Sequence, residues 1–109
     1  MKKVMKFSQE LVPLVLSGEK ATTWRLWDDK NLQEGDYISL VKRPELEEFA
    51  QAIITNVSEK KMGRINKDDF LGHEKFKNQK EMYETYSDYY KRKVDSNTPV
   101  KIIRFRLIK

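Results

Sequence analysis

Short segments rich in β-branched and aromatic residues, set apart by tight turns, are the feature of this sequence that most constrains its fold. They predict strands at residues 4–7, 21–27, 37–43 and 49–57, and a last strand that Pro99 opens. Turn sequences occupy 28–31 and 34–36, and Pro44 ends the third strand because proline cannot donate to a ladder. A series of this kind predicts a small, mostly antiparallel sheet or barrel.

Two further segments predict helices. Residues 10–17 form a short apolar stretch that we interpret as a buried helix, with Pro13 in its first turn and Gly18 as its C-terminal cap. A second helix is predicted to begin after Asn78, with Glu81 completing a pair similar to a capping box. The tyrosine-rich stripe of this helix could be a platform for stacking bases, but we favour the buried face of an amphipathic helix. The stripe comprises Met82, Tyr86, Tyr89 and Lys93, flanked by Tyr83 and Tyr90.

Length and composition limit the remaining choices. At 109 residues, we expect a single domain over 1–109, mainly β with α: a small mixed barrel of about five to six strands with two or three helices at its rim. The absence of Cys and the presence of one His exclude disulfides, thiolate chemistry and multi-histidine metal sites, so we expect no metal and no cofactor. No apolar stretch is long enough to span a bilayer and no signal peptide is recognised, so we expect a soluble, cytoplasmic protein.

Charge is unevenly divided along the chain. Residues 1–54 carry 8 basic and 9 acidic side chains, whereas residues 55–109 carry 14 basic and 8 acidic ones. An excess of lysine and arginine in one half suggests a polyanionic partner, and nucleic acid is favoured over a membrane because no basic amphipathic helix with an apolar face is present. A soluble surface rich in lysine explains the charge equally well.

The stretch from Gly18 to Arg25 offers the groups that chemistry would need. Alternation in a strand places the Thr23 hydroxyl and the Arg25 guanidinium on one face about 7 Å apart, with Lys20 at the mouth of that strand. A hydroxyl, an ammonium and a fork of donors suit an anionic group or the edge of a nucleobase, and they also suit a nucleophile beside a cation. The alternative is that both cations are solvated surface charges and that the threonine only fills the strand.

This stretch resembles the signature of the ASCH domain family, which belongs to the PUA-like barrel superfamily. The resemblance rests on an apolar helix that runs into Gly18-Glu19-Lys20, on Thr23 and Arg25 in the next strand, and on the Gly35-Asp36 turn. A closing strand at 101–108 also fits. The resemblance implies a PUA-like β-barrel over the whole chain, with a basic cleft that binds RNA or a modified nucleotide or nucleoside.

One branch of the family implies an enzyme instead. The chain is similar to small amidohydrolases that deacetylate N4-acetylcytidine with a lysine, a threonine and a glutamate, which match Lys20, Thr23 and Glu74 here. In that reading the threonine supplies the hydroxyl, the lysine activates it or neutralises the oxyanion, and the glutamate shuttles protons. Arg25 would anchor the substrate. Other carboxylates compete for the glutamate's place: Asp68, Asp69 and Glu81.

Several other side chains are candidates for the cleft. Trp27 shares a face with Thr23 and could stack on a base, whereas Trp24 is expected in the core. Arg104 and Arg106 share a face of the last strand and could contact phosphate, unless that face is simply solvated. His73 is expected to be exposed.

Two hypotheses therefore remain, a binding module and an amidohydrolase. A nuclease and a protein-interaction role are the residual alternatives, and we expect a monomer.

Overall fold

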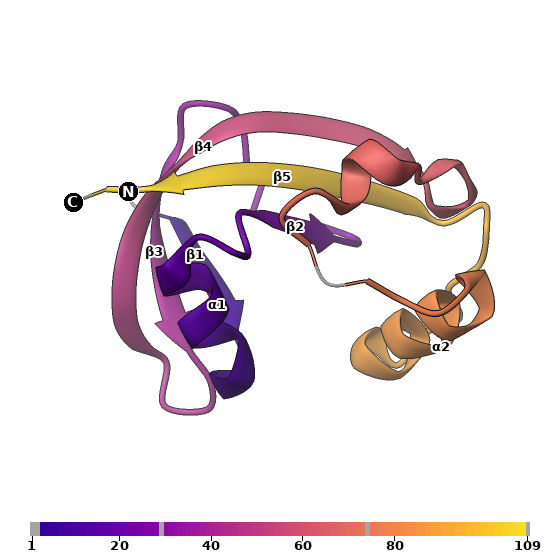
Figure 1. Cartoon of the computed structure of the whole chain (residues 1–109), viewed down its shortest axis with the longest axis horizontal. Coiled ribbons are helices and arrows are strands. Elements are labelled where there is room, and N and C mark those ends of the chain that lie inside the picture. The colour runs from indigo at the N-terminus through magenta and orange to yellow at the C-terminus, as the bar shows by residue number, and fades with distance from the viewer. Residues whose placement is uncertain (1–2, 29, 74, 109) are drawn as a thin grey trace.

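The strands form one curved mixed sheet. Within residues 3–28, 30–73 and 75–108, which the computed structural model describes, five strands follow the order β1-β3-β4-β5-β2 and curl into a half-barrel (Figure 1). The strands are β1 (Lys3–Phe7), β2 (Thr22–Arg25), β3 (Tyr37–Lys42), β4 (Glu47–Lys61) and β5 (Pro99–Leu107). The helices are α1 (Val12–Ser17) and α2 (Gln79–Tyr90), and short 3-10 turns occupy η1 (Gln9–Leu11), η2 (Met62–Arg64) and η3 (Lys67–Phe70). The predicted class, mainly β with α, is confirmed.

Strand pairing explains where the observed bounds depart from the predicted ones. β1 pairs with β3 in parallel, and all other neighbours are antiparallel. β4 was predicted over 49–57 but continues to Lys61, because its polar second half pairs with β5 as far as Pro99. β2 is shorter than predicted and ends at Arg25, and Trp27 beyond it has a positive φ of 50°.

The sheet separates two hydrophobic clusters in the described part of the chain. The barrel cluster comprises Met5, Phe7, Val15, Leu32, Ile38, Leu40, Ala52, Ile54, Ile103 and Phe105. The helix cluster comprises Trp24, Leu26, Met62, Met82, Tyr86, Val94, Val100 and Ile102. β5 contributes to both, since Ile103 points to the first cluster and Ile102 to the second, as strand alternation requires. β5 therefore packs against the barrel cluster with one face and against the helix cluster with the other.

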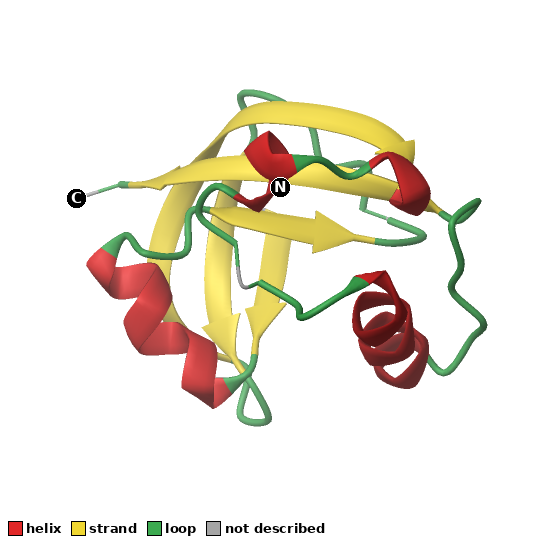
Figure 2. Ribbon diagram, turned by 45° about the vertical axis from the view of Figure 1, so that its right-hand side comes forward, coloured by secondary structure: helices red, strands yellow, loops and turns green. Residues whose placement is uncertain are grey.

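The two helices lie on opposite sides of β2 (Figure 2). α1 has Pro13 in its first turn and ends at Gly18, whose φ is 88°, as predicted. The Asn78 side chain caps α2 by accepting from the Glu81 N–H at 2.9 Å. Lys91 then adopts the left-handed conformation and ends the helix.

The predicted tyrosine stripe of α2 is only partly buried. Met82 and Tyr86 lie in the helix cluster, but Tyr89 is 43% exposed and Lys93 lies beyond the helix end. Among the described residues, no helix is long and apolar enough to cross a membrane.

Candidate functional site

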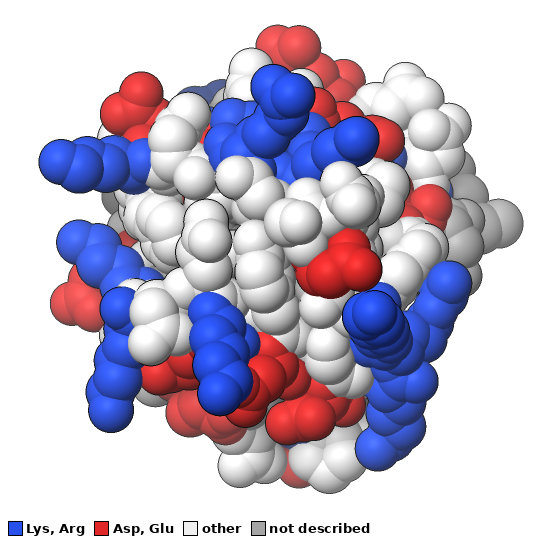
Figure 3. Space-filling model, turned by 90° about the vertical axis from the view of Figure 1, so that its right-hand side faces the viewer, with Lys and Arg blue, Asp and Glu red and all other residues white. Residues whose placement is uncertain are grey.

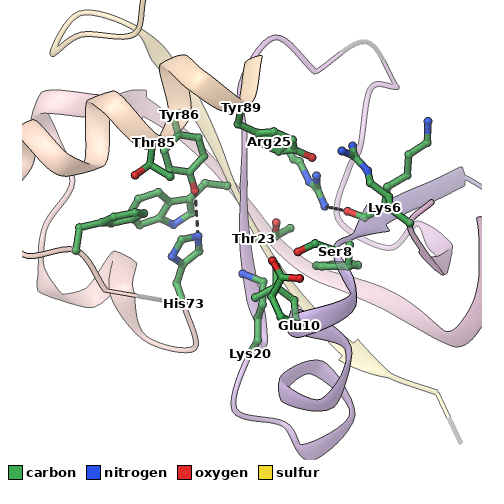
Figure 4. A pocket seen from close by; sticks show the side chains of 15 residues that line it. Lys6, Ser8, Glu10, Lys20, Thr23, Arg25, His73, Thr85, Tyr86 and Tyr89 are labelled. Carbon is green, nitrogen blue, oxygen red and sulfur yellow. Dashed lines mark hydrogen bonds between the residues drawn. The ribbon is translucent and has the colours of Figure 1, made fainter. Parts of the chain in front are cut away.

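A pocket of about 530 Å³ lies between β2, the chain that enters α1, and α2 (Figure 4). Its volume falls in the range of roughly 300–1,000 Å³ that is usual for small-molecule sites. The aromatic lining consists of Phe7, Trp24, His73, Phe76, Tyr86 and Tyr89. The polar lining consists of Lys6, Ser8, Glu10, Lys20, Thr23, Arg25, Arg43 and Thr85. We call this cavity the first pocket.

Lys20 reaches the first pocket because of the turn that follows α1. Gly18 ends the helix, and the Lys20 N–H donates back to the Leu14 carbonyl at 3.0 Å. The Lys20 side chain is 4% exposed, and its Nζ donates to the Thr22 carbonyl at 2.9 Å. A buried ammonium needs such acceptors, since desolvation without them is costly.

Thr23 and Arg25 line the same pocket from β2. Thr23 is 5% exposed. The Arg25 Nη2 donates to the Lys6 carbonyl at 3.1 Å, and its Cζ lies 5.3 Å from the centre of the Phe7 ring. Its Nε is buried and has no hydrogen-bond partner among the described residues. Lys20, Thr23 and Arg25 therefore line one cavity, as the sequence predicted from their positions on or beside one strand face. Their roles stay a prediction.

A stack of rings forms the opposite wall. Trp24 and His73 lie 3.9 Å apart, centre to centre, at 13°, and Tyr86 stacks on Trp24 at 5.9 Å. The Tyr86 hydroxyl lies 3.3 Å from the His73 Nε2. Trp24 is buried as expected, but it is also part of the pocket wall.

The expectation that His73 is exposed was wrong, since it is 7% exposed. Gly72, with a φ of 73°, lets the preceding loop approach β2, and its carbonyl accepts from the N–H groups of Ala21 and Thr22 at 2.9 and 3.1 Å. This contact holds the loop against the strand and turns His73 onto Trp24. The glycine directly before the histidine was the available signal.

The carboxylate that the structure describes at the pocket is Glu10. Glu74, the glutamate predicted from the sequence, lies outside the described residues. Its competitors do not line the pocket: Asp69 pairs with Lys60 at 2.8 Å, and Asp68 and Glu81 lie on η3 and in the first turn of α2. Glu10, Ser8 and Thr85 were not found from the sequence, because no local pattern indicates that their side chains face the Lys20 motif. A stacking role was considered for the tyrosines of α2 but not favoured, and Tyr86 and Tyr89 line the pocket.

The remaining candidates lie outside the first pocket. Trp27 lines a neighbouring cavity, and the Arg92 Cζ lies 3.8 Å from the centre of its ring. Arg104 donates to the Asp68 carbonyl at 2.9 Å, and Arg106 is exposed. Neither arginine lines the first pocket. Arg104 lies opposite Thr22 in the pairing of β2 with β5, and the Thr22 hydroxyl donates to the Leu71 carbonyl at 2.8 Å.

Charge on the outer surface is mixed. On the side of the molecule where α2 lies, lysines and arginines occupy separate places with acidic side chains between them (Figure 3). The excess of positive charge in the second half of the sequence therefore does not form one broad basic patch on this face. No group of three or more potential metal ligands occurs among the described residues.

Comparisons with known proteins extend the fold assignment. No family model and no curated protein matches this sequence. A solved structure from Enterococcus faecalis V583, EF3133 of the DUF984 family model, superposes with a TM-score of 0.79 at 18% identity, covering 99% of this chain and 80% of that one. An ASCH domain from Lactobacillus crispatus JV V101 gives 0.72 at 14% identity, covering 96% and 79%.

An ASCH protein from Zymomonas mobilis gives a TM-score of 0.67 at 13% identity, covering 94% of this chain and 65% of that one. At these identities the likeness concerns the fold. The helix that ends at Gly18, the β2 strand and the closing β5 strand are the elements on which the sequence resemblance was based. The chain has the fold of an ASCH domain.

Proposed function

We propose that the first pocket binds the base of a modified nucleoside or nucleotide, presented alone or within RNA. The observation that carries the proposal is the meeting of buried Lys20 and Thr23 with a wall of stacked rings in one cavity of about 530 Å³. Bases stack on aromatic side chains whatever their sequence, and hydroxyl and cationic donors can read the polar edge of the ring. The likeness to ASCH domains supports this choice.

A second function, amide hydrolysis, is favoured by the buried contact between Lys20 and β2. The Lys20 Nζ donates to the Thr22 carbonyl, which directs the ammonium to the strand that carries the Thr23 hydroxyl. With N4-acetylcytidine, the Thr23 oxygen would bond to the acetyl carbon while the amide C–N bond breaks and a proton passes to the leaving amine. Water would then release acetate and restore the hydroxyl. Lys20 would stabilise the oxyanion, and the sequence offers Glu74 for the proton transfers.

The test measures binding and turnover separately. Titration calorimetry with N4-acetylcytidine, cytidine and a short single-stranded RNA gives affinity, and chromatography detects cytidine released from the acetylated nucleoside. Lys20→Met and Thr23→Val keep side-chain size, and each should weaken binding about ten-fold or more by removing a buried donor. Lys61→Met and Thr55→Val, both on exposed positions of β4, are the matched controls and should bind as the unaltered protein does.

The outcomes separate the two functions. Release of cytidine that Thr23→Val abolishes supports hydrolysis, whereas binding without release supports the binding module alone. Thermal unfolding of each variant checks that the fold is intact. If the unaltered protein neither binds nor converts any of these ligands, the proposed function is wrong.

A further inference from the structure

A second pocket of about 440 Å³ adjoins the first, and its chemistry differs. The two cavities share four lining residues. Three of them are the cations Lys6, Arg25 and Arg43, and the fourth is Tyr89. Glu10 lines the first pocket and is absent from the lining of the second. The boundary between the cavities is therefore more positive than the interior of the first pocket.

Backbone pairing brings these cations together. Lys6 lies on β1 and Arg43 directly follows β3, the parallel neighbour of β1. The Arg43 N–H donates to the Phe7 carbonyl at 2.9 Å, and Arg25 on β2 donates to the Lys6 carbonyl at 3.1 Å. Figure 4 shows Lys6 and Arg25 side by side at one end of the first pocket, away from His73.

Within the described part of the chain, the three shared cations have no acidic side chain as an ion-pair partner. Neither Lys6 nor Arg25 nor Arg43 forms an ion pair with a carboxylate in the part of the chain that the structure describes. The guanidinium of Arg43 lies 5.2 Å from the centre of the Tyr89 ring, which holds the cation without cancelling its charge. Asp28 also lines the second pocket, but its carboxylate is bound by Lys101 at 2.7 Å and by the Leu32 N–H.

We propose that the second pocket binds a phosphate group carried by the sugar of the ligand whose base lies in the first pocket. This inference rests on the proposed function and narrows it from nucleosides to phosphorylated ligands. A guanidinium can donate two parallel hydrogen bonds to phosphate, and a lysine adds a compact positive charge. Lys6 and Arg43, which face the shared boundary, would select for the phosphate, while Lys20 and Thr23 contact the base.

The test compares a nucleoside with its phosphorylated forms. Calorimetry at low salt measures the affinities for N4-acetylcytidine, for its 5′- and 3′-monophosphates and for a short RNA containing the same base. We expect a monophosphate or the RNA to bind about ten-fold or more tightly than the nucleoside, and added salt should reduce this preference. Tight binding of a monophosphate would identify a free nucleotide as the ligand. Tight binding of the RNA alone would show that the phosphate belongs to a phosphodiester.

Variants assign the preference to the second pocket. Lys6→Met and Arg43→Gln remove the charges but leave the backbone bonds of both residues, so the sheet should be retained. Each should lower the affinity for the phosphorylated ligand about five-fold or more, and should lower the affinity for the nucleoside by a clearly smaller factor, so that the preference for phosphate shrinks. The exposed controls Lys61→Met and Arg64→Gln should change neither.

Other outcomes overturn the inference in distinguishable ways. Equal affinities for nucleoside and phosphorylated ligands would overturn the inference and leave the proposed function standing. A preference that Lys61→Met reduces as much as Lys6→Met would show a general effect of net charge and would also overturn it. Failure of every ligand to bind would overturn both.

Discussion

Asp28 and Lys101 join the loop after β2 to β5 through an ion pair at 2.7 Å, with side chains 6% and 17% exposed. Burial of the Asp28 carboxyl acts to raise its pKa. The hydrogen bonds from Lys101 and from the N–H groups of Leu32 and Lys30 outweigh burial, so the pKa lies below its ordinary value. The ion pair also fixes the loop at the edge of the second pocket, which Asp28 lines.

This lowered pKa predicts a loss of stability in acid. The unfolded chain takes up a proton on Asp28 below about pH 4, whereas the folded chain resists it, so the contribution is complete above that pH. The stabilising contribution of Asp28 disappears as the pH falls through the lowered pKa that this carboxyl has in the folded state. Asp28→Asn should lower the free energy of unfolding by about 1–2 kcal/mol at pH 7. Urea unfolding between pH 7 and pH 2.5 should show this difference shrinking below about pH 4.

The control for this prediction is Asp88→Asn. Asp88 is exposed and forms no ion pair with the described residues, so its replacement should have little effect at any pH. The hydrogen bond from Lys3 also lowers the pKa of Asp36, so the effect of Asp28 is isolated by measuring the difference between the variant and the unaltered protein. A difference for Asp28→Asn that stays constant with pH would contradict the explanation.

At the scale of elements, the sequence could predict those helix and strand ends that depend only on residues nearby in the chain. Gly18 and Asn78 marked helix ends because a left-handed cap and a side-chain cap depend on neighbours within a few residues. The extension of β4 to Lys61 could not be predicted, because it depends on pairing with β5 about forty residues away in the sequence. The burial of His73 depends in the same way on the contact between Gly72 and β2.

Substitutions at Gly18 and Gly72, which both have a positive φ, test how the loop that contains Gly72 and His73 is held against β2. A Cβ at Gly18 would meet nothing within 4 Å, so Gly18→Ala should cost only backbone strain, about 1 kcal/mol. A Cβ at Gly72 would lie 3.2 Å from the Ala21 nitrogen and 3.3 Å from the Thr22 Oγ1. Gly72→Ala should therefore cost about 2–3 kcal/mol, since strain is added to displacement of the loop from β2.

Urea unfolding measures both losses, and ligand affinity gives a second readout. Gly72→Ala should also weaken binding in the first pocket because His73 and Trp24 move apart, whereas Gly18→Ala should affect binding less. Equal losses of stability for the two variants would show that the contact with β2 does not constrain the loop.

At the scale of the whole molecule, the first pocket lies where the barrel and helix clusters meet. Phe7 belongs to the barrel cluster, Trp24 and Tyr86 belong to the helix cluster, and all three line the cavity. The sequence could predict the β2 side of the site, because alternation and the Gly18 cap are local. It could not predict the α2 side, because nothing in the sequence states which face of a helix meets a strand about sixty residues earlier.

This division predicts that the two clusters affect the site differently when each is weakened. Met82 is 3% exposed in the helix cluster and does not line the first pocket, and Ile54 is 1% exposed in the barrel cluster. Replacing either by Ala should cost about 2–5 kcal/mol through the cavity that it leaves. Met82→Ala should chiefly speed hydrogen exchange of the α2 amides and weaken ligand binding, because α2 carries one wall of the pocket. Ile54→Ala should speed exchange across the strands and leave the affinity of the folded molecules nearly unchanged.

Equal acceleration of hydrogen exchange in α2 and in the strands by Met82→Ala would contradict this prediction. It would mean that the helix opens only when the whole fold opens, and the pocket would then be a rigid part of one core.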